Sequence, residues 1–302
     1  MLFSFILTVI GLSLFETVSS VDNAIINAEV LATMSKKTQR WFLTWGMLIA
    51  VFVVRGLLPF IVIWVFNTKL TALQVLSATW SSDPLVLDSV NKSAPILLIT
   101  GGIFLIFLFL HWLFLEDKKL GLPITEKFFM SKGVWFYATV SILLLIISWF
   151  ALKESNLMGF GAVIGSSLFF ITQGFKQNAE EEERKLLGSA KSDISKLLFL
   201  EIIDSTFSID GVLGAFAFTL SVPFILIGNG LGALIVRQLT VSNIERIKKY
   251  VYLKNGAMYS ILVLGIIMIL HSFGFNIPEY ASPLATFIII SFFFFKSKKS
   301  IN

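Results

Sequence analysis

Cysteine is absent from this 302-residue chain, and histidine occurs only twice, at His111 and His271. Without cysteine there is no disulfide, no thiolate metal ligand and no thiol nucleophile. Both histidines fall near the ends of apolar segments, away from the acidic motifs described below, which disfavours a typical zinc site and a copper(I) site. Metal binding in this protein would therefore rely on oxygen ligands.

Charge is also scarce: 14% of the residues are charged, whereas 56% are apolar and 31 are phenylalanine. The mean hydropathy is +0.85, far above the usual balance for a soluble domain. A bilayer core about 30 Å thick needs roughly 20 apolar residues per helix. The sequence therefore predicts an all-α fold, a polytopic transmembrane helical bundle of seven to nine spans. Candidate spans lie near residues 2–33, 41–66, 95–115, 134–152, 157–175, 195–220, 222–240, 256–272 and 281–295.

The net charge of +5 comes from basic residues in the short loops, not from one face of a folded domain, so nucleic acid is not an expected partner. Twenty lysines and arginines fall in one alternating set of loops, and only Lys69, Lys92 and Lys153 fall in the other. By the positive-inside rule, this predicts a multi-pass protein of the inner (cytoplasmic) membrane with its N-terminus outside and its C-terminus in the cytoplasm.

The chain divides into two related halves. We expect a first membrane half at 1–175, with a repeat core of about 1–115, a charged cytoplasmic linker at 176–194, and a second membrane half at 195–302. Each half carries an acidic motif followed by a basic position, Arg55 or Arg237. Because the two motif helices run in opposite directions under this topology, the sequence predicts an inverted-topology repeat with a site near the bilayer midplane.

The two motifs place acids inside otherwise apolar stretches: FETVSSVDNAIINAEVLA, residues 15–32, and EIIDSTFSIDGVLGAFAFT, residues 201–219. Their acids are Glu16, Asp22, Glu29, Glu201, Asp204 and Asp210. A charged side chain at the centre of a membrane helix costs about 2.5 to 3.5 kcal/mol, so six ionised acids would cost roughly 15 to 20 kcal/mol. Because Arg55 can neutralise only one of them, the others must face water, be protonated or hold cations.

Helical spacing groups these side chains on shared faces. At about 100° per residue, one stripe of the first motif holds Glu16, Ser20, Asn23 and Asn27, and the adjacent stripe holds Ser19, Asp22 and Glu29. In the second motif, Asp210 falls roughly opposite Glu201 in an ideal helix. A break near residues 208–211 would return Asp210 to the acidic face, and Gly211 and Gly214 favour such a break. Glycines in membrane helices also serve close packing, so both interpretations stand.

These positions predict a cation site shared by the two motifs, in which Asp22 and Asp210 approach each other. The candidate metal ligands are Glu16, Asp22, Asn23, Glu201, Asp204 and Asp210. Supporting positions are Ser20, Asn27, Glu29, Arg55 and Ser208. Of these, Glu29 is expected to reach water and Arg55 to act as a counter-ion. Carboxylate, amide and hydroxyl oxygens suit hard or borderline divalent ions such as Mn²⁺, Mg²⁺ or Ca²⁺.

An enzyme is not expected. No serine motif accompanies the histidines, no H-E-x-x-H pattern is present, and the glycines of GNGLGALIVR lie in an apolar span instead of following a soluble strand. An intramembrane aspartyl protease could use Asp22 and Asp210 as a pair that shares a proton. That hypothesis leaves the other acids without a role.

At the two motifs the sequence resembles the TerC family of membrane proteins, within the LysE transporter superfamily, and especially a TerC-like branch long catalogued as uncharacterised. The matching segments are FETVSSVDNAIINAEVL, FLTWGMLIAVFVVRGLLPF, LEIIDSTFSIDGVLGAFAFT, GNGLGALIVRQLT and YLKNGAMYSI, and they cover both halves, roughly 1–115 and 195–272. The resemblance implies a multi-spanning metal-ion transporter, since several members are associated with manganese efflux and the founding ones with tellurite resistance. The acids that it implies in metal handling are Glu16, Asp22, Glu201, Asp204 and Asp210. One departure is Lys254–Asn255, where this branch usually has an acidic residue and a histidine.

The sequence and the resemblance together predict a transporter of divalent metal cations, with Mn²⁺ export as the first candidate and no permanently bound cofactor. The alternatives are a non-transporting membrane scaffold or assembly factor, or a tellurite-resistance component. A scaffold is expected to balance its buried charge, so the excess of six acids over one arginine favours transport. The expected partners are a divalent cation and the lipid bilayer, and the oligomeric state is left open.

Overall fold

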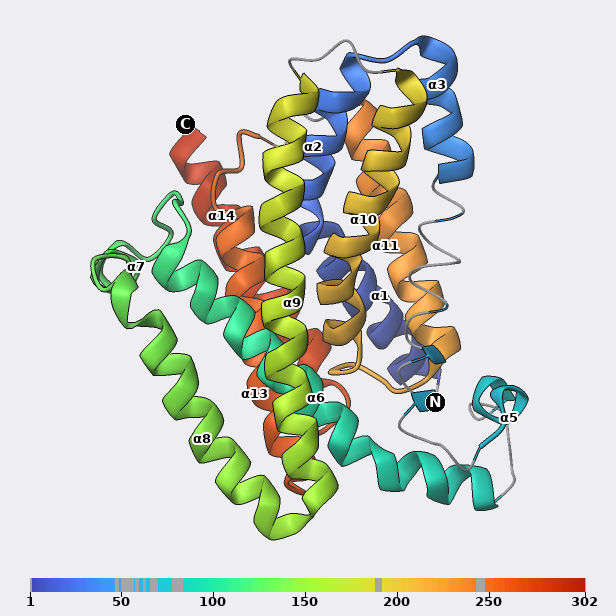
Figure 1. The fold of residues 1–302 in the computed structure, drawn as a ribbon, viewed down its shortest axis with the longest axis vertical. Helices are drawn as coiled ribbons and strands as arrows, with labels where there is room; N and C mark the ends of the chain where they lie inside the picture. Colours follow the sequence, from blue (N-terminus) through green and yellow to red (C-terminus); the bar gives the residue numbers. More distant parts are fainter. Residues whose placement is uncertain are drawn as a thin grey trace.

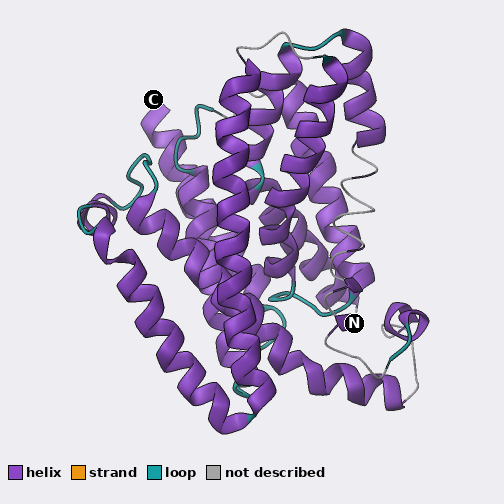
Figure 2. Cartoon of the chain, viewed as in Figure 1, coloured by secondary structure: helices purple, strands orange, loops and turns teal. Residues whose placement is uncertain are grey.

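The computed structural model describes residues 2–46, 49, 57, 60–61, 64–65, 70–77, 84–187, 192–242 and 248–301. Within these residues the chain forms helices, turns and loops without a strand (Figure 2), as the composition predicted. The helices are α1 (Leu2–Ser19), α2 (Val21–Ala32), α3 (Lys36–Trp41), α5 (Ala72–Ser77), α6 (Pro84–Leu115), α7 (Pro123–Met130), α8 (Phe136–Glu154), α9 (Asn156–Leu187), α10 (Asp193–Ala215), α11 (Val222–Ser242), α13 (Leu253–Ser272) and α14 (Ala281–Ile301), with a π-helical turn at Phe42–Gly46 and a 3-10 turn at Gly133–Trp135.

Each predicted apolar segment from residue 95 onward coincides with one helix, whereas most of the predicted span at 41–66 lies outside the described residues. Among the described residues, five helices are long and apolar enough to cross a membrane, and shorter apolar helices run over Ser4–Ser19 and Val222–Gln238. The protein is therefore an α-helical membrane protein.

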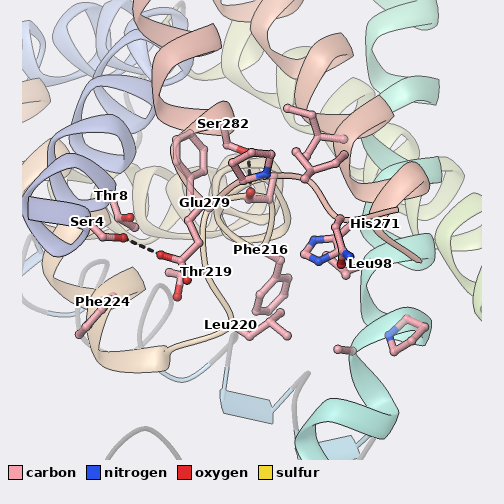
Figure 3. Close-up of a pocket in the computed structure, with 18 of the residues that line it drawn as sticks. Ser4, Thr8, Leu98, Phe216, Thr219, Leu220, Phe224, His271, Glu279 and Ser282 are labelled. Carbon is pink, nitrogen blue, oxygen red and sulfur yellow. Dashed lines mark hydrogen bonds between the residues drawn. The ribbon is translucent and has the colours of Figure 1, made fainter. Parts of the chain in front are cut away.

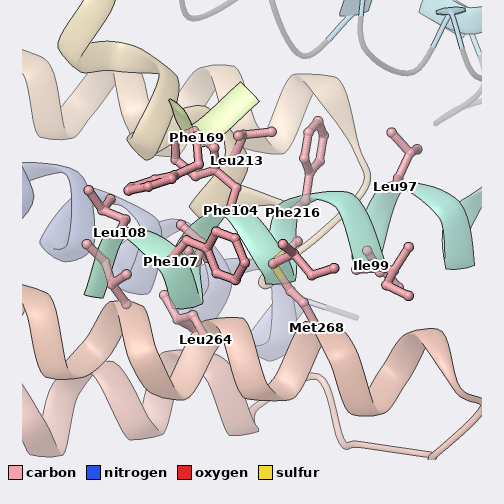
Figure 4. Packing of buried hydrophobic residues seen from close by; sticks show 14 of the residues in the cluster. Leu97, Ile99, Phe104, Phe107, Leu108, Phe169, Leu213, Phe216, Leu264 and Met268 are labelled. Carbon is pink, nitrogen blue, oxygen red and sulfur yellow. The ribbon is translucent and has the colours of Figure 1, made fainter. Parts of the chain in front are cut away.

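Helix α6 occupies the centre of the bundle. In its apolar stretch, 83% of the residues are buried, whereas in the apolar stretch of α8 only 22% are buried. The outward face of α8 carries apolar side chains such as Trp149. Phe104 and Phe107 of α6 contact Phe169 of α9, with ring centroids 6.2 and 5.8 Å apart. Leu213 of α10 and residues of α13 complete this core (Figure 4). The helices around α6 thus bury their inner faces on it and leave outer faces for lipid.

Glycine lets the helix backbones approach closely at several crossings. A β-carbon built on Gly102 of α6 would lie 3.0 Å from the carbonyl oxygen of Gly265 on α13, and the reverse distance is 3.1 Å. A β-carbon on Gly165 of α9 would lie 2.3 Å from the carbonyl oxygen of Thr100. Small residues at such interfaces are the usual means of association inside a membrane, where lipid removes the hydrophobic driving force between helices.

The connections between helices gather at the two ends of the bundle (Figure 1). At one end, Asp193 accepts hydrogen bonds from the backbone amide of Ser35 and the hydroxyl of Thr38, at 3.0 and 2.8 Å. At the other end, the hydroxyl of Ser4 donates to Glu279 at 2.6 Å. Lys118, Lys119, Lys248 and Lys254 line one pocket with Val21 and Ile25 of α2, and Lys248 lies 3.3 Å from Glu29 of the same helix.

At the Asp193 end, residues Lys254 and Asn255 hold the α6–α7 connection against the start of α13. The Lys254 ammonium lies 2.7 Å from Glu116, and the Asn255 amide donates to the fully buried Glu126. Burial alone would raise the pKa of Glu116, but the imidazole of His111 and the Lys254 ammonium outweigh burial and lower this pKa to about 2. Lys254 and Asn255 therefore have a structural role in this connection.

We expect Gly165→Ala to destabilise the protein by about 1 to 3 kcal/mol, because its methyl group would overlap the Thr100 carbonyl oxygen. Gly174→Ala on the same helix is the matched control, since a β-carbon there meets nothing within 4 Å. It should be neutral or stabilising by up to about 1 kcal/mol, because alanine is the better helix former. Thermal unfolding in detergent measures both, and equal unfolding temperatures for the two variants would contradict the packing argument.

Glu116→Gln should lower stability at neutral pH by roughly 2 to 3 kcal/mol. The folded pKa of about 2 lies below the unfolded value of 4.5. The contribution of the Glu116 carboxylate to the free energy of unfolding is therefore complete above pH 4.5 and is lost as the pH falls toward 2. Unfolding of wild type and variant at pH 7 and pH 3.5 should show the gap narrowing in acid. Glu154→Gln, at an exposed position on α8, controls for general effects of removing a carboxylate, and a gap that does not change with pH would oppose this assignment.

Candidate cation site in the buried acidic motifs

The helix of the first motif bends at Ser20, which separates α1 from α2 with φ −90° and ψ 5°. The backbone bonds continue across the bend, from Ser20 to Glu16 at 3.1 Å and from Ala24 to Ser20 at 2.9 Å. The second motif has no such bend, because α10 is continuous through residues 208–211. The break that the sequence suggested there is absent, so Asp210 stays on a different face from Asp204.

Glycines of the second half surround Glu16, which is 1% exposed. A β-carbon on Gly211 of α10 would lie 2.5 Å from Glu16 Oε2, and one on Gly232 of α11 would lie 2.6 Å from Glu16 Cβ. Ser20 donates to Glu16 Oε1 at 2.8 Å. Gly211 therefore serves close packing, the second of the two interpretations left open by the sequence, and the space it leaves holds a carboxylate.

One turn beyond Glu16, a small polar cavity of about 10 Å³ lies between α2, α10 and α11. Its polar lining consists of Ser20, Asn27, Asp204 and Arg237. That volume is close to the smallest space that holds one water molecule, so it also matches a single small ion. Asn27 Oδ1 is buried without a hydrogen-bond partner in the described part of the chain. A buried acceptor of this kind calls for a ligand or an ordered water.

The cavity lining includes one basic side chain, Arg237. The Arg237 guanidinium is 3.7 Å from Asp204 Oδ2, donates a hydrogen bond to the Phe42 carbonyl, and stacks over the Phe42 ring at 4.3 Å. Because the contact with Asp204 is longer than a normal hydrogen bond, Phe42 holds the guanidinium more closely than Asp204 does. Arg237 thus offsets the charge of Asp204 while leaving space beside that carboxylate.

Asp210 faces α9 instead of the cavity. Its Oδ2 accepts a hydrogen bond from Lys176 Nζ at 2.5 Å, and the two side chains are only 13% and 9% exposed. Lys176 is the first residue of the predicted cytoplasmic linker at 176–194, but α9 continues to Leu187 and Lys176 is buried. The predicted excess of six buried acids over one arginine is therefore wrong, because Asp204 and Asp210 each have a basic neighbour.

The other predicted positions are distributed around this region. Glu201 packs against the π-helical turn, where a β-carbon on Gly46 would lie 2.0 Å from its Oε1. Glu29 is exposed and lies 3.3 Å from Lys248, as expected for a side chain that reaches water. Ser208 donates to the carbonyl of Asp204 in its own helix.

Three positions cannot be placed. The side chains of Asp22 and Asn23, and all of Arg55, lie outside the described residues. Among the side chains that are described, no three carboxylate or histidine groups come together as a metal site. The predicted approach of Asp22 to Asp210 stays a prediction.

Lys176 is the functional neighbour that sequence reasoning missed. It continues a buried stripe of α9 at helical spacing, because Phe169, Thr172 and Lys176 are 1%, 4% and 7% exposed. This pattern was present in the sequence, but the acidic run that follows it suggested a solvated segment. Helical periodicity, carried one turn further, would have indicated that Lys176 is buried.

The fold and these carboxylates define a class, an α-helical membrane protein with an acidic interior between α1, α2, α10 and α11. The family model described as a protein of unknown function (DUF475) matches residues 21–300. The chain belongs to this family. No curated protein and no solved structure matches the chain. The match includes the whole of α10 and α11, so the second motif and its glycine and arginine neighbours lie within the family's range.

Lys176→Met should destabilise the protein by about 3 to 5 kcal/mol, because it leaves Asp210 buried without its ion-pair partner. The double variant Lys176→Met/Asp210→Leu should recover most of this loss, since an apolar pair of similar volume is often as stable as a buried ion pair. Lys92→Met is the matched control: it breaks a pair whose side chains are 76% and 58% exposed and should cost less than about 1 kcal/mol. A double-mutant cycle by thermal unfolding measures the coupling. Equal costs for the two single variants would contradict a buried pair.

Proposed function

We propose that this protein is a transporter of divalent metal cations that exports Mn²⁺ across the inner membrane. The observation that carries the proposal is the small cavity at Asp204, in which a carboxylate, the Ser20 hydroxyl and the unpartnered Asn27 carbonyl oxygen share a space of one-ion size. All three groups offer oxygen, the donor type that Mn²⁺ and Mg²⁺ prefer. Glu16 lies next to them, joined through Ser20.

The position of the cavity also supports transport. It lies between the first motif, on α2, and the second motif, on α10, so both halves of the chain contribute to its wall. Asp193 at the start of α10 bonds the loop after α2, while Gly214 near its end packs on Phe15 of α1. The two motif helices are therefore antiparallel, as an inverted repeat requires. The resemblance to the TerC family adds to this proposal.

A non-transporting scaffold is the second candidate, and the ion pairs favour it. Asp210 with Lys176 and Asp204 with Arg237 balance two of the acids within the protein. In a scaffold these pairs would serve only to fix the register of α9, α10 and α11. The transporter hypothesis differs because it requires the cavity oxygens to bind a metal ion.

Asp204→Asn should abolish protection of cells from manganese excess, because it removes the carboxylate from the cavity while keeping nearly the same volume. Cells lacking their own manganese exporter would carry the wild type or the variant at equal membrane levels. Intracellular Mn²⁺ should rise to the level of the empty vector in the variant. Asp88→Asn, at an exposed position on α6, is the control and should protect fully.

Asn27→Leu is a second variant. It removes one oxygen from the cavity and keeps Asp204, so Arg237 retains its acidic neighbour. It should also raise intracellular Mn²⁺, by at least several-fold relative to wild type. Full protection by both variants would rule out the cavity as the metal site. Loss of folding in both variants, together with no manganese export by the folded wild type, would favour the scaffold.

A further inference from the structure

A large cavity of about 560 Å³ opens at the Glu279 end of the bundle (Figure 3). We name it the vestibule; its lining includes Ser4, Thr8, Phe218, Phe224, His271 and Glu279. Among the described residues that line it, Glu279 is the one full charge, and no lysine or arginine takes part. The vestibule therefore carries one carboxylate and no base among its described lining residues, which suits the entry of a cation.

The vestibule and the Asp204 cavity lie along the same helices. On α1, Thr8 lines the vestibule and Glu16 lies two turns further, about 12 Å along the axis. On α11, Phe224 lines the vestibule and Ala233 lines the Asp204 cavity. A cation that moves between the two spaces would pass between α1, α10 and α11.

Apolar side chains close this route. Leu12 and Phe15 of α1 are fully buried, and the Phe15 ring lies 5.9 Å from the ring of Phe218, which lines the vestibule. A β-carbon on Gly228 of α11 would lie 2.5 Å from Leu12 Cβ, so α1 and α11 are in contact at this level. These apolar side chains therefore separate the Asp204 cavity from the vestibule.

One polar side chain interrupts the seal. Asn229 is fully buried, and neither its Oδ1 nor its Nδ2 has a hydrogen-bond partner among the described residues. It lies one helical turn from Ala233 on the same face of α11, on the side toward the vestibule. An amide with both ends unbonded inside a membrane protein is unfavourable for folding alone. Packing therefore gives no reason for an asparagine here.

We propose that Asn229 is a further cation ligand, placed between the Asp204 cavity and the vestibule, whose amide oxygen binds the divalent ion as it crosses the seal. This inference rests on the proposed transport function and adds a step to it. In the sealed arrangement neither end of this amide is hydrogen-bonded among the described residues. When Leu12, Phe15 and Phe218 separate, its oxygen replaces part of the hydration shell that the ion loses.

The test is Asn229→Leu in purified protein, because leucine has a similar volume and no polar atoms. Thermal unfolding without metal should occur at the same temperature as wild type or higher, since the variant removes an unbonded amide. Mn²⁺ flux into proteoliposomes should fall at least tenfold. Asn255→Leu is the matched control: its amide donates to Glu126 and to the Lys119 carbonyl, so it should lose stability.

The outcomes separate the two proposals. Normal Mn²⁺ flux through Asn229→Leu, with an active wild type, overturns the role of Asn229 and leaves the transport function standing. A loss of stability comparable to that of Asn255→Leu also overturns it, because the amide would then be bonded in the fold. A wild type that carries no Mn²⁺ under any metal gradient overturns the transport function and this inference together.

Discussion

The burial of Glu16 between two glycines is the constraint on which the polar interior depends. Gly211 and Gly232 leave room for a carboxylate where any other side chain would occupy the space. Their small size also brings α10 and α11 close enough to α1 for the hydroxyl of Ser13 to bond the Gly228 carbonyl at 2.9 Å. A larger residue at either glycine would both separate the helices and displace the Glu16 carboxylate. The same two glycines therefore determine the helix packing and the position of the acid.

The acids of the second motif show how a membrane protein keeps charge in its interior. Asp204 and Asp210 lie on different faces of an unbroken helix, and each meets a base from a neighbouring helix. The two pairs differ in closeness: Lys176 is in hydrogen-bond contact with Asp210, whereas Arg237 is held mainly by Phe42. Asp210 therefore suits a structural role better than Asp204 does.

Much of the architecture follows from a membrane environment. Helix α6 is buried on most sides, and its neighbours approach it through glycines at Gly102, Gly165 and Gly265. Outer helices such as α8 expose apolar side chains that lipid would cover. The two buried ion pairs described above join α10 to α9 and to α11, and Glu16 of α1 lies beside the same helices. Asn229 differs from the other buried polar residues described, because both ends of its amide lack a hydrogen-bond partner among the described residues.

The sequence by itself determined the helical class, most helix positions and the two acidic motifs, because long apolar runs and buried acids are local properties of the chain. It also predicted the exposure of Glu29, which lies close to the end of its helix. Only the tertiary structure decided that α10 stays continuous, that Asp210 pairs with Lys176, and that Ser20, Asn27 and Asp204 line one cavity. These features join residues far apart in the chain through the angle and rotation at which helices pack. Helical periodicity shows which residues share a face, but it does not determine which helix that face meets.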